Sequence, residues 1–140
     1  MKELDYLLDT YYNKEDWHES RLPQAEAKQY YEEQIKNKNI EFLKDKGKIV
    51  GYLEIWFLDK EQTERIIAGE FFDCLKENIT DGLIAYVQTA YIEKEHRGKR
   101  NLMKLNKDLQ YKHKDGDWVG IMYQDGHNKG SFTFHKRGEI

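Results

Sequence analysis

A basic, glycine-containing segment between a strand pattern and a helix pattern is the part of this sequence best suited to chemistry. Residues 93–100 read Glu-Lys-Glu-His-Arg-Gly-Lys-Arg, so four cationic side chains surround Gly98. A strand that enters a helix through such a turn presents backbone N–H groups at the positive end of the helix dipole, where a pyrophosphate or another anion binds. The same residues are also typical of a basic, solvated connection between two core elements. Both interpretations remain open on these residues alone.

Two apolar patterns flank this segment. Residues 85–92 place β-branched and aromatic side chains on both faces, as expected for a strand inside a covered sheet. After the turn, Leu102, Leu105 and Leu109 recur at offsets of three and four, which predicts an amphipathic helix. Residues 85–109 therefore predict a strand, a turn and a helix around which the rest of the chain is organised.

The N-terminal part of the chain predicts at least one helix. Residues 4–12 are apolar enough for either a short strand or a helix, and the pattern does not decide between them. Residues 13–21 are polar and predict a loop anchored by Trp17. Apolar residues then recur at helical spacing from Pro23 to about Lys38, and proline is well suited to the first turn of a helix.

A hairpin and two further elements complete the pattern. The strand-like runs 40–44 and 48–58 are joined by a short turn that contains Gly47, which indicates a β-hairpin. Residues 61–77 have a helical pattern and form either a packing helix or a substrate lid. Residues 118–124 predict another strand after the central unit.

The composition fits one globular domain over residues 1–140. Hydrophobic residues make up 39% of the chain, and the net charge of −3 argues against a protein that coats nucleic acid with its whole surface. The single cysteine, Cys74, excludes an internal disulfide and fits a reducing compartment. The histidines show no spacing typical of a metal site. Without an apolar leader or a run of about 18 apolar residues, we expect a cytoplasmic protein that does not enter a membrane.

Three segments resemble the GNAT superfamily of N-acetyltransferases. Residues 92–99, Ile-Glu-Lys-Glu-His-Arg-Gly-Lys, are similar to the family's strand-to-helix signature, in which an Arg/Gln-x-x-Gly-x-Gly/Ala turn holds the pyrophosphate of acetyl coenzyme A. Residues 47–52, Gly-Lys-Ile-Val-Gly-Tyr, resemble the family's hairpin before the coenzyme strand, and residues 127–138 are loosely similar to its C-terminal segment. The resemblance implies a single α/β domain with a mixed sheet and a GNAT-like acyl-CoA N-acyltransferase fold. It also makes 61–77 a helical insertion and leaves the final strand incomplete.

The resemblance implies that the basic turn binds acetyl-CoA as a co-substrate. The residues expected to contact the coenzyme are Ile92, Arg97, Gly98, Lys99, Arg100, Asn101 and Leu102. Arg97 matches the first position of the signature, whereas Arg100 stands in place of its first glycine and Leu102 in place of glycine or alanine. Because the first glycine lets the backbone approach phosphate, the Arg100 side chain either turns outward or occupies the phosphate space.

N-acyl transfer requires a base for the amine, donors for the oxyanion and an acid for the thiolate. The resemblance implies that backbone N–H groups near the end of strand 85–92 are the oxyanion donors. Candidate bases are Glu93, which closes that strand, and Glu54 on the adjacent strand; a surface or salt-bridged carboxylate is the alternative for each. Tyr123 and His135 are the candidate acids, and His135 is expected in a terminal helix.

Three functions are consistent with these residues. The first is an N-acyltransferase that transfers an acetyl or other acyl group from coenzyme A to an amine on a small molecule or a protein. The second is a GNAT-fold protein that has lost catalysis and acts as a binding module, since Arg100 and Leu102 replace small residues. The third is a modifier directed to nucleic acid by the basic segment 94–114. A homodimer, in which another subunit supplies the last strand, is a further expectation.

Overall fold

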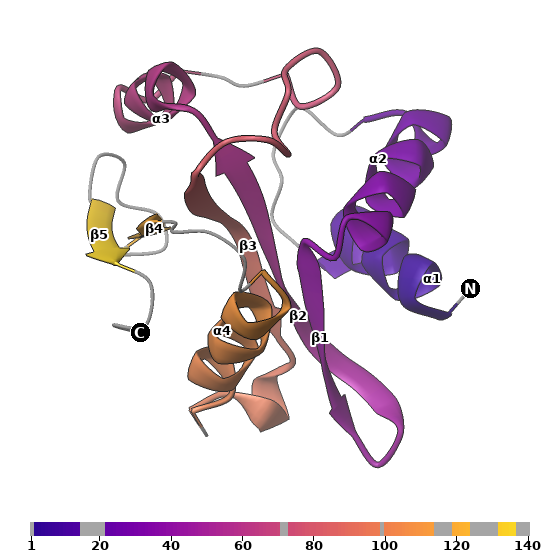
Figure 1. The fold of residues 1–140 in the computed structure, drawn as a ribbon. Coiled ribbons are helices and arrows are strands. Elements are labelled where there is room, and N and C mark those ends of the chain that lie inside the picture. Colours follow the sequence, from indigo (N-terminus) through magenta and orange to yellow (C-terminus); the bar gives the residue numbers. More distant parts are fainter. Residues whose placement is uncertain are drawn as a thin grey trace.

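The described part of the chain forms a five-stranded mixed sheet with helices on both faces (Figure 1). A computed structural model describes residues 2–14, 22–70, 73–98 and 100–113 with their side chains, and residues 119–123 and 132–136 as backbone. The strands, in their order across the sheet, are β1 Ile40–Asp45, β2 Lys48–Leu58, β3 Ile84–Ile92, β4 Val119–Tyr123 and β5 Phe132–Lys136. The α-helices are α1 Lys2–Asp9, α2 Gln24–Lys36, α3 Lys60–Ile67 and α4 Asn101–Lys112, with a π-helical turn at Thr10–Lys14 and a 3₁₀ turn at Lys94–His96.

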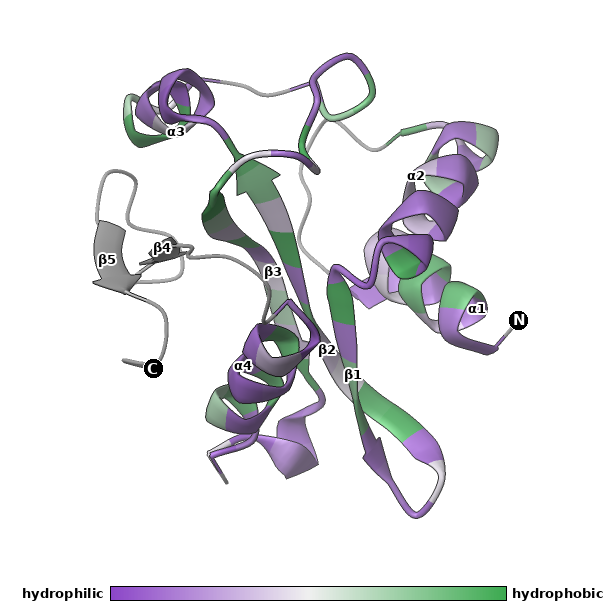
Figure 2. Cartoon of the chain, in the orientation of Figure 1, coloured by the Kyte–Doolittle hydropathy of each residue, from purple (hydrophilic) through white to green (hydrophobic). Residues whose placement is uncertain are grey.

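β2 is the centre of the core, because it is buried from Val50 to Leu58. On one face of the sheet, Leu105 and Leu109 of α4 pack against apolar side chains of β1, β2 and β3. On the other face, α1 and α2 form an aromatic layer with the sheet. The members of that layer are Leu4, Leu7, Tyr11, Ala27, Tyr31, Ile40 and Tyr52. Figure 2 shows the hydrophobic stretches of β2 and β3 lying between these helices.

β3 contains a β-bulge at Gln88. Glu54 of β2 pairs with Thr89 and Ile55 pairs with Val87, so Gln88 is an extra residue without a partner in that register. A bulge bends its strand and leaves backbone groups outside the regular ladder. The bulge therefore lies beside Glu54, in the middle of the sheet.

β4 runs parallel to β3 but pairs with only its beginning. The paired residues are Ile84 with Val119, Ala85 with Gly120 and Tyr86 with Ile121. Among the described residues this pairing ends at Tyr86, whereas β3 continues to Ile92. The two strands thus separate close to the bulge at Gln88.

The sequence predictions for the central unit, the hairpin and the helix after Pro23 are confirmed. For residues 4–12 the helical alternative is the observed one, and the predicted loop at 13–21 is partly wrong, because Asn13 and Lys14 belong to the π-helical turn. Trp17 lies outside the described residues.

Two sequence predictions about helices are wrong. The helix predicted for 61–77 ends at Ile67, because Gly69 takes a left-handed conformation with φ +82° that terminates it. The terminal helix predicted around His135 is instead strand β5, which pairs antiparallel with β4. The run Phe-Thr-Phe at 132–134 favours a strand because aromatic and β-branched side chains suit a pleated surface.

Residues 73–83, which precede β3, are held at several points, and we call them the wall segment. Ile79 is buried, and its carbonyl accepts a hydrogen bond from the Phe57 N–H at 2.8 Å. The Gly82 N–H donates to the Phe57 carbonyl at 3.2 Å. From α3, the Gln62 amide donates to the Asn78 carbonyl at 2.8 Å. The wall segment is therefore held against the end of β2.

Gly82 of the wall segment lies directly against the backbone at the end of β2, so a larger residue there should be destabilising. A Cβ atom there would lie 2.0 Å from the Leu58 carbonyl carbon and oxygen. We expect Gly82→Ala to lower the free energy of unfolding by about 2–3 kcal/mol, because backbone must move to admit a methyl group. The measurement is urea denaturation. Gly47→Ala is the control: its Cβ has open space, and φ +81° alone costs about 1 kcal/mol. Equal losses at both positions would contradict the close approach.

Candidate functional site

The connection from β3 to α4 has the geometry of an anion site. Gly98 has φ +76°, and Arg100, the N-cap of α4, has φ +60° and ψ 19°. The Arg100 side chain makes no capping hydrogen bond, and the Asn101 amide donates instead to the His96 carbonyl at 2.7 Å. The first N–H groups of an α-helix have no partner within the helix, so α4 presents them at this turn.

Arg97 is fixed at the mouth of this turn. Its Nε donates to the Ile92 carbonyl at 2.6 Å, which leaves the two terminal guanidinium nitrogens directed elsewhere. The side chain is exposed, so its positive charge is accessible from solvent. A guanidinium held in this way suits bidentate binding of a phosphate.

Two depressions adjoin the turn on the α4 face of the sheet. The first has a volume of about 410 Å³ and is lined by Ala90, Ile92, Arg97, Gly98, Arg100, Asn101, Leu102 and Met103. The second, of about 330 Å³, is lined by Arg100, Met103, Lys104, Lys107 and Asp108. Lys104 is partly neutralised by Asp108 at 3.0 Å. The cations and helix N-terminus form a donor set that fits a phosphorylated ligand such as coenzyme A.

Two residues that replace the small residues of the resembled signature line the first depression. The Arg100 side chain is exposed and lines both depressions, while its backbone keeps the left-handed conformation that suits glycine. Leu102 is half-buried and packs against the core beneath α4. Lys99 lies outside the described residues.

A second group of polar side chains is buried on the α2 face of the sheet. Glu54 of β2 is 1% exposed, and its Oε2 accepts hydrogen bonds from the Tyr30 hydroxyl and, at 2.9 Å, from the Gln34 amide. The Tyr30 hydroxyl accepts a hydrogen bond from Trp56 Nε1 at 2.7 Å. Asn39 donates to the Gln34 side-chain oxygen at 3.1 Å. We call Tyr30, Gln34, Glu54 and Trp56 the Glu54 network.

The Glu54 network keeps the Tyr30 phenol protonated. Burial, followed by the negative charge of Glu54 and the hydrogen bond to it, raises the pKa of Tyr30 well above its usual value. At neutral pH the hydroxyl therefore remains a donor to the carboxylate. A carboxylate this deeply buried is unusual unless hydrogen bonds stabilise it, so the network marks a candidate functional group.

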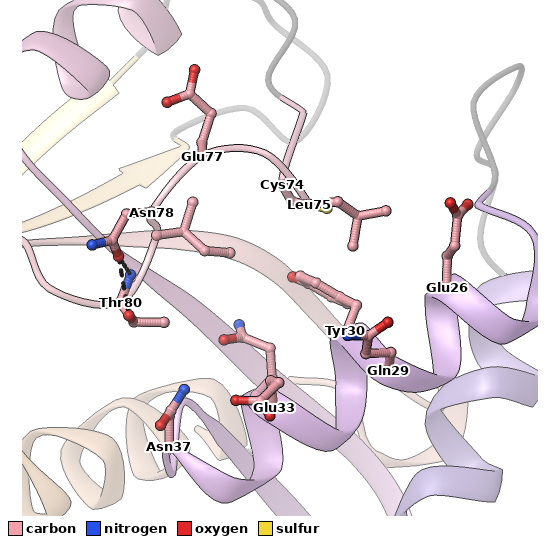
Figure 3. A pocket seen from close by; sticks show the side chains of 12 residues that line it. Glu26, Gln29, Tyr30, Glu33, Asn37, Cys74, Leu75, Glu77, Asn78 and Thr80 are labelled. Atoms are coloured by element: carbon pink, nitrogen blue, oxygen red, sulfur yellow. Dashed lines mark hydrogen bonds between the residues drawn. The ribbon is translucent and has the colours of Figure 1, made fainter.

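A cavity of about 370 Å³ lies between α2 and the wall segment (Figure 3). Tyr30 and Gln34 belong to its lining, and Figure 3 shows the Tyr30 ring projecting from α2 toward the wall segment. The remaining lining residues are Glu26, Gln29, Glu33, Asn37, Cys74, Leu75, Glu77, Asn78, Ile79 and Thr80. The cavity thus gives a ligand access to the Tyr30 side of the network.

The two predicted bases, Glu54 and Glu93, lie apart in the structure. Glu93 lies at the far end of β3 from the cavity, where its Oε2 accepts a hydrogen bond from the Tyr6 hydroxyl of α1 at 2.9 Å. Burial, and then Glu93, raises the pKa of Tyr6 above its usual value. Tyr123 and His135 belong to β4 and β5, which the structure describes as backbone. Among the described residues, no group of three or more His, Cys, Asp or Glu is arranged to hold a metal ion.

Sequence reasoning missed the partners of Glu54. Tyr30 and Gln34 lie four residues apart and so share one face of α2, and Trp56 follows Glu54 by two residues and shares its face of β2. These spacings place each pair together, but nothing in the sequence brings α2 to β2.

No described helix combines the length and apolarity needed to cross a membrane.

Several solved structures are similar to this chain. The loading GNATL domain of CurA from Lyngbya majuscula has a TM-score of 0.58 and 13% identity, and the similarity covers 89% of this chain and 61% of that domain. The ribosomal-protein-alanine N-acetyltransferase from Brucella melitensis biovar Abortus 2308 has a TM-score of 0.45 and 21% identity, covering 84% and 68%. A predicted acetyltransferase with acetyl-CoA from Clostridium acetobutylicum has a TM-score of 0.44 and 18% identity, covering 79% and 62%.

The chain has the α/β fold of the GNAT superfamily, as its sequence resemblance implied. The similarity to the CurA domain carries this conclusion, and at 13% identity it establishes the fold alone. The chain spans 61% of the length of that domain. No protein-family model and no curated protein sequence matches the chain.

The left-handed backbone of Arg100 gives a prediction about stability. A side chain in this conformation costs about 1–2 kcal/mol, and glycine avoids that cost while losing about 0.5–1 kcal/mol in chain entropy. We therefore expect Arg100→Gly to be more stable than Arg100→Ala by about 1 kcal/mol in urea denaturation. Both variants remove the same charge, so their difference isolates the backbone. Equal stabilities would contradict the left-handed conformation.

Cys74 gives a prediction about pH, because it lines the cavity near Glu54. Burial, followed by the negative charges of Glu54 and Asp73, raises the pKa of the Cys74 thiol to about 11. Its reaction with methyl methanethiosulfonate should therefore accelerate about tenfold per pH unit up to about pH 10 without a plateau. Glu54→Gln should accelerate the reaction of Cys74 at pH 8, because removing the negative charge of Glu54 lowers the pKa of the thiol. The urea-unfolded protein is the control, and a plateau of the folded protein near pH 9 would contradict the burial.

Proposed function

We propose that this chain is an acyl-CoA-dependent N-acyltransferase that transfers an acetyl or other acyl group to an amine. The observation that carries the proposal is the position of Glu54, a buried carboxylate beside the bulge of β3 and one hydrogen bond away from a cavity. A proton acceptor at this point would lie close to the place where β3 and β4 separate. The GNAT fold supports the proposal as an analogy of fold.

The turn before α4 supports the coenzyme half of the proposal. When bound, acyl-CoA supplies an acyl group activated as a thioester. Arg97, Gly98 and the N-terminus of α4 would hold its pyrophosphate, and Arg100, Lys104 and Lys107 would add positive charge beside it. Backbone N–H groups that the bulge at Gln88 leaves outside the ladder would donate to the oxyanion.

Glu54 is the better of the two candidate bases. Glu93 is half-buried at the end of β3 and is held by Tyr6, toward α1. Glu54 pairs with Thr89 next to the bulge, and its hydrogen-bond partner Tyr30 lines a cavity that can admit an acceptor. General-base catalysis by a positioned carboxylate contributes about 10²–10⁴-fold, which is the effect expected of Glu54.

Binding without catalysis, to coenzyme or to nucleic acid, is the competing function. It is favoured by the cations that line both depressions on the α4 face: Arg97, Arg100, Lys104 and Lys107. Such a surface would bind a polyanion in a strongly salt-dependent way and would need neither Glu54 nor the cavity.

The test of the proposed function is calorimetric titration with acetyl-CoA. We expect a dissociation constant of about 1–100 μM, and a loss of about tenfold in Arg97→Ala, because one charge-assisted phosphate contact is worth about 1.4 kcal/mol. Lys28→Ala, an exposed cation on α2, is the matched control and should bind as the unchanged protein does. Absence of binding at millimolar acetyl-CoA, together with salt-sensitive binding of a single-stranded oligonucleotide, would replace this function by the nucleic-acid alternative.

A further inference from the structure

We infer that the cavity between α2 and the wall segment receives the amine acceptor, and that Tyr30 takes the proton of that amine and passes its own to Glu54. The inference rests on the proposed function, since it names the acceptor site and the proton path of the same reaction. Three features support it: the hydrogen bonds of Tyr30, the support around Glu54 and the character of the cavity lining.

The hydrogen bonds of Tyr30 leave one position for a ligand. A phenol hydroxyl has one proton and two acceptor lone pairs. The proton goes to Glu54 Oε2, and one lone pair accepts the Trp56 Nε1–H at 2.7 Å. The second lone pair can accept an N–H from an amine in the cavity that Tyr30 lines. Because Trp56 is a donor only, it also fixes the direction in which the Tyr30 proton points.

The transfer balances in protons and bonds. An amine that enters protonated first gives one proton to the Tyr30 oxygen as the Tyr30 proton goes to the Glu54 carboxylate. The neutral amine then forms its N–C bond to the acyl carbon while the C–S bond to coenzyme A breaks, and the second amine proton goes to the released thiolate. Glu54 afterwards returns its proton to solvent. Tyr30 never becomes a phenolate, which its strongly raised pKa would disfavour.

Glu54 is held for this role by Gln34, which Asn39 supports in turn. The Gln34 amide donates to Glu54 Oε2 at 2.9 Å and to the Ile55 carbonyl at 3.1 Å. Asn39 in turn donates to the Gln34 oxygen at 3.1 Å, and the Asn39 carbonyl accepts the Ile55 N–H at 2.9 Å. The carboxylate is therefore preorganised, and Gln34 is a positioning residue.

The lining of the cavity indicates the class of acceptor. Its charged members are Glu26, Glu33 and Glu77, and none of the described residues that line it is Lys, Arg or His. Arg65 neutralises Glu77 at 2.7 Å, so the cavity keeps the charges of Glu26 and Glu33 on α2. Such a lining attracts an amine that arrives protonated and repels one that carries a carboxylate. A volume of about 370 Å³ suits a small amine or the end of a longer chain.

The first experiment locates the acceptor without requiring turnover, and Cys74 is its reporter. Cys74 is the single cysteine of the chain and lines the cavity. We expect butylamine, at up to about 100 mM and with coenzyme A present, to slow the reaction of Cys74 with methyl methanethiosulfonate at least threefold. The probe 4-aminobutanoate has the same chain length but carries a carboxylate, so it should not slow the reaction of Cys74. An unchanged rate with butylamine, or equal protection by both probes, would overturn the acceptor site.

The second experiment tests the proton path with two tyrosines of α2. Tyr30→Phe should lower the acetylation of butylamine by about 10²-fold or more while leaving acetyl-CoA affinity unchanged, because it removes the hydroxyl and keeps the ring. Its residual rate should rise with pH as the amine loses its proton in solution. Tyr31→Phe is the matched control, since its ring lies 5.0 Å from that of Tyr30 but faces the aromatic layer, and its rate should stay within about threefold.

The outcomes separate the two proposals. If the protein without substitutions does not bind acetyl-CoA, the proposed function itself is rejected. Coenzyme binding and Cys74 protection without acetylation of butylamine, or a Tyr30→Phe variant as active as Tyr31→Phe, would overturn the proton path. Glu54→Gln should match Tyr30→Phe in rate and pH profile, and a Glu54→Gln variant of normal activity would overturn it equally.

Discussion

The burial of one carboxylate within the sheet is the constraint on which the α2 side of this structure depends. An ionised carboxylate removed from water costs several kcal/mol unless hydrogen bonds replace its hydration. Glu54 is 1% exposed, and the groups that replace water come from α2 through Tyr30 and Gln34. Because Tyr30 and Gln34 share a single face of α2, the helix must turn that face toward Glu54. The Asn39 carbonyl, just after α2, accepts the Ile55 N–H at 2.9 Å and so holds the end of the helix against β2.

The wall segment turns this buried network into a site. The cavity beside Tyr30 exists because the wall segment lies opposite α2. Ile79 and Gly82 bind the wall segment to Phe57 through backbone hydrogen bonds, so the cavity is bounded by two elements that are each tied to β2. Arg65 adds a further tie, since it pairs with Glu77 at 2.7 Å and Glu70 at 2.9 Å. The contacts that stabilise the wall segment therefore also set the width of the cavity. A substitution that loosens the wall segment would also widen the cavity.

Local patterns predicted the elements of this fold but not the contacts between them. Alternation and helical spacing were sufficient for the hairpin, for α2 and for the unit from β3 to α4, since each depends on residues close in sequence. The prediction for 61–77 failed because the helical pattern continues past Gly69, whose backbone conformation ends the helix. The partners of Glu54 could not be predicted, because Tyr30 is 24 positions away and only tertiary packing joins them. The site residues named from the family signature remain predictions.

The two candidate binding regions lie on opposite faces of β3, and this restricts how they can act together. The basic depressions adjoin α4, whereas the cavity and Glu54 lie on the α2 side. An acyl group held by the turn can meet an amine held by the cavity only by passing through the sheet. Continuous pairing would prevent this, since backbone and side chains would fill the interval. The structure separates β3 from β4 after Tyr86 and bulges β3 at Gln88, beside the strand position of Glu54. The irregularity of the central strand is thus what would allow chemistry between two regions that a regular sheet would keep apart.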